Sequence, residues 1–416
     1  MSPQSAYRSF VGVAKDTANA NLQVAHIVGV STLTLRTIVN GGTTSLTVAG
    51  ATFSAVIVDG VLTETVACSG NLTGTIDGST IACAALANAH TPNAYVYFQL
   101  TASVGPTAFL SVTKLDFHDD YVQLYDKGYR GSQADIYGAQ QGTRVANISL
   151  DGDLFPDTFG YLMSSMCGAY DYTATAGIVP TQYAFSPLNT GNGQPQPYLF
   201  YDYNPAASNT RVYAKAVVSD LNIKFAPGAL ASYTSTIKAF ASGVVANPAT
   251  IPPAFSSFTP LPARAGTVSI GGTITGKVEM ADYSFKRQAF GEIFTLQGIQ
   301  DPLAIFGGPL ALSVKSSIIV DDDVQLLNYI QQSQPSFTLT ARIGQGAAAT
   351  DNGITIQVTK ANYEAVKVVQ TGKAWVTLDV PFQGLANATD ATAAGGGLSP
   401  AKVTLSTKAV GTGTLY

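Results

Sequence analysis

Histidine is the first residue type to test for acid–base or metal chemistry in this chain. The three histidines stand at His26, His90 and His118. None has the spacing of a zinc site, and none accompanies a nucleophile in a recognisable motif. His118 and Asp119 could share acid–base work, but the polar start of a loop accounts for them better. The histidines therefore favour a protein that is not an enzyme.

An acidic triplet, Asp321–Asp323, offers the oxygen ligands that Mg²⁺ and Ca²⁺ prefer. Adjacent carboxylates at a helix start cannot all converge on one ion, and no glycine-containing calcium loop follows. Carboxylates also cap a helix and stabilise its positive end, and an apolar-periodic stretch begins directly afterwards. The glycine-rich spot at Gly395–Gly397 lacks the Lys-Ser/Thr ending of a phosphate loop. We therefore expect no metal and no cofactor.

The three cysteines, Cys68, Cys83 and Cys167, bear on the redox compartment. An odd number, in a chain whose start lacks the basic-then-apolar pattern of a signal peptide, favours reduced and structural thiols. The alternative is that Cys68 and Cys83 face each other on neighbouring strands. No apolar run approaches the roughly 20 residues of a membrane helix, so no membrane contact is expected.

Composition limits the class of partner. The chain has 416 residues, which favours two or three domains. Only 12% of the residues are charged and 46% are hydrophobic, whereas soluble domains carry about 25% charged residues. The net charge of −4 gives no basic surface for gripping nucleic acid. Sparse charge with many apolar side chains predicts a protein that buries much of its surface against partners.

A β-rich plan occurs twice along the chain. The first copy comprises a strand, a polar loop, a strand and a helix, at Val112–Phe117, Asp119–Gln141, Thr143–Leu150 and Pro156–Cys167. The second copy repeats this order at Val268–Met280, Ala281–Gly307, Leu310–Val320 and Val324–Gln331. Further extended segments follow each helix. A duplicated chain closes a ring with half as many subunits.

The residue patterns specify the architecture of each copy. Phe159, Leu162 and Met166 place one apolar stripe along the first helix. Strand residues alternate, with Ile148 and Leu150 on one face and polar side chains on the other. We therefore predict a mainly β protein with two tandem β-sandwich domains, each with one short flanking helix.

Two stretches divide the chain further. Residues 31–102 are poor in charge and consist of short runs separated by Gly and Asn, which predicts a small all-β insertion; a β-meander integral to the main domain is the alternative. Ala246–Ala265 contains five prolines and is predicted to be a stiff linker. Ala386–Pro400 is predicted to be a mobile loop. The predicted domains are residues 1–30 with 103–245, the insertion 31–102, the linker 246–265, and residues 266–416.

The segment Thr143–Gly168, TRVANISLDGDLFPDTFGYLMSSMCG, carries a family resemblance. It resembles the strand, acidic/proline turn and helix of phage tail tube (major tail) proteins, whose pattern is similar to SxEGxxxPDxLGYLL. Asp151 stands where that pattern has Glu, and Phe159 where it has Leu. Val218–Phe240 resembles the strand pair that follows in the family, and Phe290–Pro302 a loop that opens the second half. The insertion's TSLTV, ETV and ALANAH resemble a β-module inserted in phage structural proteins.

The resemblance implies a structural role in a long-tailed, siphovirus-like phage. Tube domains of this family are β-sandwiches whose inner sheets join around a ring into a continuous barrel, and the rings stack into a conduit for the genome. The loop between the first two strands of each domain reaches the neighbouring ring. By position, the implied interface residues are Tyr121, Tyr125, Arg130, Phe285, Arg287 and Phe294. The alternative is that they are solvated loop residues.

The lumen of such a tube is expected to be neutral or acidic, because DNA must pass without sticking. Candidate lumen residues are Asp116, Glu279 and Asp282. The implied partners are further copies of this chain, tail tip or baseplate proteins, a tape measure protein and a tail terminator. The implied location is the virion tail, assembled in the host cytoplasm, with viral DNA passing through without sequence-specific binding.

Two copies per chain predict three chains per ring with pseudo-six-fold symmetry, and six chains per ring is the alternative. A surface adhesin or another virion decoration or fibre protein is the alternative class. A β-sandwich hydrolase is disfavoured because no catalytic set is recognisable.

Overall fold

The computed structural model describes most of the chain. The described residues are 10–15, 21–25, 29, 31–37, 45–48, 53–59, 62–69, 72–75, 80–91, 94–99, 106–127, 135–175, 178–204, 209–246, 256, 258–296, 300–343, 352–370 and 375–407. Within them the fold is mainly β, with several antiparallel sheets and two α-helices. This confirms the predicted mainly β class. Neither described helix is long and apolar enough to cross a membrane.

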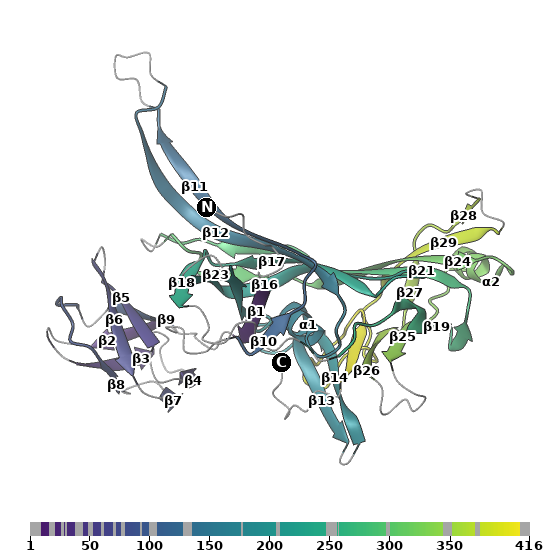
Figure 1. Cartoon of the computed structure of the whole chain (residues 1–416), viewed down its shortest axis with the longest axis horizontal. Helices are drawn as coiled ribbons and strands as arrows, with labels where there is room; N and C mark the ends of the chain where they lie inside the picture. The colour runs from purple at the N-terminus through teal and green to yellow at the C-terminus, as the bar shows by residue number, and fades with distance from the viewer. Residues whose placement is uncertain are drawn as a thin grey trace.

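One long antiparallel sheet runs through both copies (Figure 1). In the first copy its strands, in spatial order, are β11 (Lys114–Asp126), β12 (Gly138–Asp153), β17 (Ser232–Ala239) and β16 (Asn209–Phe225). The second copy continues with β21 (Val278–Arg287), β24 (Leu310–Ile319) and β29 (Thr377–Gly384), and β27 (Ala361–Tyr363) and β28 (Lys367–Val369) both pair with β29. We call these strands the long sheet. In both copies the first of these strands pairs with the second, the second pairs with the last one in chain order, and that last strand pairs with a strand that precedes it in the chain. This shared order supports the predicted duplication.

A second sheet also combines strands of both copies. In spatial order it contains β13 (Gly168–Thr175), β14 (Ile178–Pro187), β30 (Lys402–Thr407), β26 (Asn352–Val358), β25 (Phe337–Ile343), β19 (Gly266–Ile270) and β20 (Thr273–Thr275). The two copies meet where β14 pairs with β30. The predicted single strand Val268–Met280 is wrong, because Gly271 and Gly272 adopt φ of 59° and 84° and turn β19 back as β20.

A side branch of the first copy shares β16 with the long sheet. It is formed by β10 (Ala108–Leu110), β1 (Phe10–Lys15), β15 (Tyr198–Tyr203) and β18 (Gly243–Ala246). The first half of β16 pairs with β15 and β18, and the second half with β17 and β21. Lys215, with φ of 54°, lies where β16 changes partners. A left-handed residue bends a strand locally, so one strand can serve two sheets.

Both predicted helices are present; the first begins at Phe159 instead of Pro156, and the second begins at Val324 as predicted and ends one residue earlier. α1 spans Phe159–Cys167 and ends at Gly168, whose φ of 89° is the left-handed conformation expected of a helix stop. α2 spans Val324–Ile330. Every residue of α1 is buried, and α1 packs on β13, β14 and β16.

The apolar core is continuous from one copy to the other. Phe225 of β16 meets Tyr283 of β21 at 6.4 Å between ring centroids, and Tyr283 in turn lies 6.4 Å from Phe337. Phe337 lies 4.8 Å from Phe382. Burying each such ring contributes about 2 kcal/mol. The shared core holds the two copies together more firmly than a linker alone would.

The predicted insertion forms a small closed barrel. Its strands are β2 (Asn21–Ala25), β3 (Thr32–Thr37), β8 (Thr80–Cys83), β6 (Leu62–Ser69), β5 (Phe53–Asp59) and β9 (Ala94–Gln99), with a separate pair of β4 (Ser45–Val48) and β7 (Leu72–Thr75). Because β2 is one of the barrel strands, the barrel begins before the predicted boundary at residue 31. Its strands pair with one another, so it is not a meander within the long sheet.

Two predicted loops are wrong in part. Most described residues of Asp119–Gln141 belong to β11 and β12, which pair as far as Asp126 and Gly138 and leave the body as a two-stranded ribbon (Figure 1). We call the part beyond Asp119 and Ala146 the first arm. Ala281–Arg287 is part of β21, and the rest of that predicted loop contains a small hairpin of β22 (Gly291–Ile293) and β23 (Ala304–Phe306), the second arm.

The predicted mobile loop Ala386–Pro400 is folded in place. Asp390 is fully buried and accepts hydrogen bonds from the Nε2 of Gln357 at 3.0 Å and the backbone N–H of Thr359 at 2.8 Å. The predicted linker Ala246–Ala265 lies partly outside the described residues. Its last part holds buried Leu261 and a short 3₁₀ turn, Ala263–Ala265.

Candidate functional site

One face of the long sheet is polar across β11, β12, β17, β16, β21, β24 and β29. β-strand side chains alternate between faces, so the residues between the buried apolar ones point outward. This polar face comprises Lys114, Asp116, His118, Asn147, Ser149, Asp151, Asp220, Asn222, Lys224, Thr234, Thr236, Lys238, Asp282, Ser284, Lys286, Ser313, Lys315, Ser317, Asp379 and Gln383. The opposite face covers the core. The long sheet is therefore one amphipathic layer spanning both copies.

Charges of opposite sign lie next to each other on the polar face. Asp282 stands between Lys224 of β16 and Lys315 of β24 in the strand register. Asp220 stands opposite Lys286, with 3.5 Å between the Asp220 Oδ1 and Lys286 Nζ atoms. Cross-strand neighbours of opposite charge stabilise a sheet modestly. The resulting surface is mixed rather than basic.

The predicted acidic lumen residues occupy two kinds of position. Asp116 and Asp282 both lie on the polar face, with Asp116 exposed opposite Ser149. Glu279 lies at a bulge between Val278 and Met280, and its Oε1 accepts a hydrogen bond from the Nε1 of Trp375 at 2.7 Å. The structure therefore places two of the three candidates on one continuous surface. Their exposure to a lumen stays a prediction.

The first arm carries exposed apolar side chains. Tyr121, Val122, Leu124, Tyr125 and Ile136 are between 39% and 54% exposed. A two-stranded ribbon buries little apolar surface by itself, so exposed side chains of this kind mark a contact surface. Tyr121 and Tyr125 thus have the exposure that an interface role requires, and that role stays a prediction. Arg130 lies outside the described residues.

Two predicted interface residues of the second copy have a different location. Phe285 is 1% exposed and packs in the core, and Arg287 is 4% exposed on the same strand. Their placement on a loop is therefore wrong, because β21 continues to Arg287. Phe294, 39% exposed, follows β22 on the second arm and remains an interface candidate.

Arg287 joins the two copies. Its Nε donates to the Met166 carbonyl at 2.8 Å, and its Nη2 donates to the Cys167 carbonyl at 3.0 Å. These are the last carbonyls of α1, where the helix dipole favours a cation. Burial lowers the pKa of Arg287 from its ordinary value. Arg287 thus fastens β21 of the second copy to the helix of the first copy.

The two arms are also linked to each other. Arg144 of β12 makes a two-pronged contact with Asp301, in which its Nε and Nη2 donate to Asp301 Oδ1 and Oδ2, each at 2.7 Å. The Asp301 carboxylate raises the pKa of Arg144. Sequence reasoning missed this pair, because no local pattern relates residues 157 positions apart. The pair holds the second arm against the base of the first.

The long sheet has an edge at each end. Among the described strands, β11 pairs with β12 alone, and β28 pairs with β29 alone. An unpaired edge presents backbone donors and acceptors that another strand can complete. The two edges belong to different copies, so they suit head-to-tail pairing between chains.

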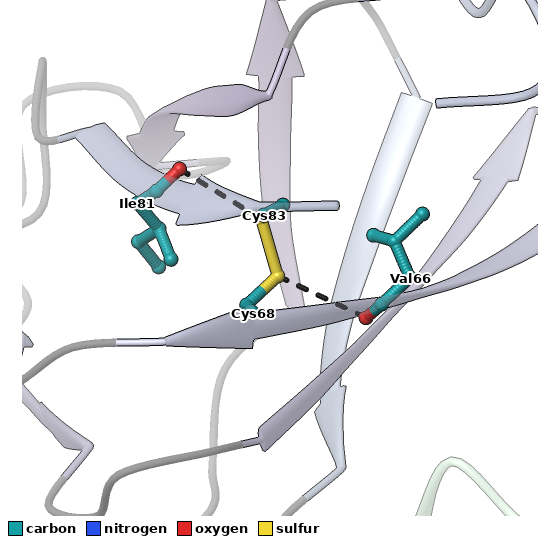
Figure 2. Close-up of a disulfide and its surroundings, with 4 residues drawn as sticks. All are labelled: Val66, Cys68, Ile81 and Cys83. Atoms are coloured by element: carbon teal, nitrogen blue, oxygen red, sulfur yellow. Dashed lines mark hydrogen bonds between the residues drawn. A yellow bond between two sulfur atoms is a disulfide. The ribbon is translucent and has the colours of Figure 1, made fainter. Parts of the chain in front are cut away.

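The small barrel contains a disulfide, shown in Figure 2, that joins Cys68 of β6 to Cys83 of β8. The prediction of reduced thiols is wrong for this pair, because β6 and β8 set the two residues directly opposite each other. The sulfurs also lie 3.8 Å from the Val66 oxygen and 3.7 Å from the Ile81 oxygen. Cys167 is the free and buried cysteine, and burial raises its thiol pKa to about 12.

Two carboxylates hold the segment that follows Cys83. Glu64 accepts hydrogen bonds from the backbone N–H groups of Ala87 at 2.6 Å and Asn88 at 3.0 Å, and its Oε2 lies 3.0 Å from His90 Nε2. Asp59 accepts a hydrogen bond from the Thr91 hydroxyl at 3.0 Å. Among the described residues, no group of three potential metal ligands is close enough to hold an ion.

The acidic triplet contributes to the start of α2. Asp322 Oδ1 accepts a hydrogen bond from the Val324 N–H at 3.1 Å, whereas the side chain of Asp323, the N-cap residue, makes no cap hydrogen bond. Lys277 pairs with both Asp321 and Asp322. These contacts fit the capping interpretation for Asp322.

Comparison with known proteins leaves the fold and these surfaces as the basis for function. No protein-family model matches the chain, and no curated protein matches it.

Proposed function

We propose that this protein is a tail tube subunit of a long-tailed phage, which assembles into stacked rings that conduct the viral genome. The observation that carries the proposal is the long sheet, which is continuous through both copies, buried on one face and polar on the other. An open amphipathic sheet with an unpaired strand edge at each end is suited to closing into a barrel with its neighbours. The polar face would then line the inside of the barrel, and the apolar core with the layers that cover it would lie outside.

The junction inside the chain supplies the pattern for a junction between chains. β16 of the first copy pairs with β21 of the second over Asp220–Phe225 and Ala281–Lys286. We infer that β28 of one chain pairs in the same way with β11 of the next. Three chains then supply six copies to one ring, and the alternative of six chains per ring would leave half of the copies outside a barrel of that size.

The arms suit contacts between successive rings. The first arm leaves the body of the chain and carries the exposed side chains of Tyr121 and Tyr125, and the second arm carries Phe294. Aromatic side chains supply much of the contact energy of protein interfaces. Tail tip, tape measure and terminator proteins would meet the tube at its ends and in its lumen.

The polar face suits a lumen through which DNA passes. Its mixed charges offer no continuous basic track for phosphates. The proposal therefore includes no sequence-specific DNA binding and no catalytic step.

Negative-stain electron microscopy of the purified protein tests the proposal. Rings or hollow tubes of uniform diameter, with three chains per ring by mass measurement, are expected at high protein concentration. Monomers or fibrous trimers without a lumen would refute the proposal and would favour an adhesin or fibre protein.

A further inference from the structure

The two helices hold equivalent positions but differ in burial. α1 follows β12 in the first copy, and α2 follows β24 in the second. Every residue of α1 is buried, whereas none of the residues of α2 is. Val324, Leu327 and Ile330 are 51%, 47% and 64% exposed. Three apolar residues spaced three apart lie along one side of a helix, so α2 leaves an apolar stripe uncovered.

The stripe adjoins a hollow at the same end of the chain. The hollow has a volume of about 410 Å³, and its apolar wall includes Ile274, Ile318 and Leu378 together with Val324 itself. Ile274 is 75% exposed. We call the stripe, Ile274 and the hollow the α2 face. In Figure 1 α2 lies at the far end of the long sheet from the first arm.

The helix of the first copy packs its side chains on β13, β14 and β16 of its own copy. Its C-terminal end shows what engages this position when another copy follows. The next copy enters the long sheet with β21, and Arg287 of that strand donates to the last carbonyls of α1. Close by, the Gln194 side chain accepts a hydrogen bond from the Gly307 N–H at 2.9 Å and donates to the Gly307 carbonyl at 3.1 Å. The end of α1 and the segment beyond it are thus held by the strand and arm that open the following copy.

Among the described strands, none continues the long sheet beyond β27 and β28, so the position beside α2 that a following copy would take is open there. We propose that the α2 face is the docking surface for the first copy of a second chain, whose β11 and arm take the place that β21 and its arm take beside α1. The exposed apolar residues of the first arm fit the apolar stripe and the apolar wall of the α2 face, whose hollow is also lined by Lys277, Asp321 and Asp322. This inference rests on the proposed ring, because it names the surfaces that meet at each junction between chains.

The α2 face is large enough for only a part of the interface between two chains. A stable interface buries roughly 1,200–2,000 Å² in total, more than a short helix provides. Pairing of β28 with β11 supplies backbone hydrogen bonds, and the α2 face supplies apolar contact. Loss of the apolar part should therefore weaken every junction.

The first test replaces two exposed residues of the stripe, Leu327→Glu together with Ile330→Glu. Both side chains already face solvent in the single chain, so the circular dichroism spectrum and the melting temperature should stay unchanged. Rings and tubes should be lost, and light scattering should report monomers. Leu398→Glu is the matched control, because Leu398 is 54% exposed in a loop outside the α2 face, and this variant should assemble like the unaltered protein. Assembly of the double variant at the unaltered concentration would overturn the inference.

A mixing experiment tests the direction of the contact. The double variant keeps an intact first copy, so it should bind the α2 face of an unaltered chain and leave that ring open. Ring yield should fall as the variant fraction rises. A variant with no effect on unaltered chains would show that two α2 faces contact each other or that neither is used, and either result would overturn the proposal.

A photoreactive amino acid at position 330 maps the partner surface. The expected adduct joins position 330 to residues 106–187 of a second chain. An adduct only within one chain, or only to residues 258–407 of a second chain, would refute the docking assignment. Junctions that cross-link as expected but never close into rings or tubes would leave this inference standing and refute the tail tube proposal. Tubes built from the double variant would refute this inference and leave the tail tube proposal standing.

Discussion

Arg287 of the second copy donates a hydrogen bond to the carbonyl of Met166, the penultimate residue of α1, at 2.8 Å. The guanidinium group is almost completely buried and also contacts the carbonyls of Cys167 and Gly308. The covalent connection between the two copies is therefore reinforced by a polar lock at the end of a helix. This lock explains why an arginine can end a strand whose earlier alternate residues are apolar.

Arg287→Met should lower the free energy of unfolding by about 2–4 kcal/mol, because the buried carbonyls lose their charged donor. Urea denaturation followed by circular dichroism measures the change. Lys286→Met is the control, because Lys286 directly precedes Arg287 in β21 and is exposed. Loss of the Lys286 side chain should change the free energy of unfolding by less than about 0.5 kcal/mol. Equal effects of the two substitutions would contradict the lock.

The contact between the arms should give a measurable coupling energy. In a double-mutant cycle of Arg144→Met and Asp301→Asn, we expect about 1 kcal/mol of coupling, since the two-pronged pair is half-buried. Lys127 and Asp135, which lie 3.7 Å apart and are largely exposed, form the control pair and should show coupling near zero. Additive effects of the Arg144 and Asp301 substitutions would mean that the arms are held by other contacts.

The small barrel should lose stability at acid pH through Glu64. Burial alone would raise the pKa of this carboxylate, but hydrogen bonds from Ala87, Asn88 and His90 outweigh burial and lower the pKa from the ordinary 4.5 to about 2. A carboxylate with a lowered folded-state pKa contributes stability that is complete above the unfolded value and is lost as the pH falls toward the folded value. The protection of the Ala87 and Asn88 amides against hydrogen exchange, taken relative to the intrinsic rate at each pH, should therefore fall between pH 4.5 and 2.

Glu64→Gln should remove most of this acid dependence, because glutamine does not titrate. Glu364→Gln, at an exposed site in the second copy, should leave it unchanged. An unaltered acid profile in the Glu64 variant would assign the dependence to another group.

Cysteine labelling should separate the three cysteines. Burial raises the pKa of Cys167 to about 12, so its thiol stays neutral and covered at pH 8. The native oxidised protein should react with no thiol reagent at Cys68, Cys83 or Cys167, and unfolding without reductant should expose Cys167 alone. Mass spectrometry after alkylation reads the sites. Labelling of Cys68 or Cys83 before reduction would contradict the disulfide.

Local signals in the sequence located the helices well. Pro156 and Asp157 lie in the turn that leads into α1, Gly168 ends the helix, and the apolar residues between them repeat with helical spacing. The alternation of Ile148 and Leu150 with polar residues likewise identified β12. Such elements are predictable because their determinants lie within a few residues of one another.

The first arm, the contact between Arg287 and α1, and the disulfide were harder to predict from the sequence. The first arm is solvated on both faces, so its strands lack the alternation that identifies a half-buried strand. At the end of β21, Arg287 interrupts an apolar alternation because its partner is a helix end far away in the sequence. Cys68 and Cys83 meet only because β6 and β8 pair. Long-range pairing decided all three features, and no short pattern encodes it.

The alternation of lysine and aspartate on the polar face has an electrostatic consequence. Neighbouring strands lie roughly 4.8 Å apart, so opposite charges repeat on a scale shorter than the roughly 8 Å over which salt screens a charge at physiological ionic strength. The fields of such neighbours cancel a short distance above the sheet. A polyanion moving along this surface would meet a nearly flat potential, with neither deep wells to arrest it nor a barrier to turn it back.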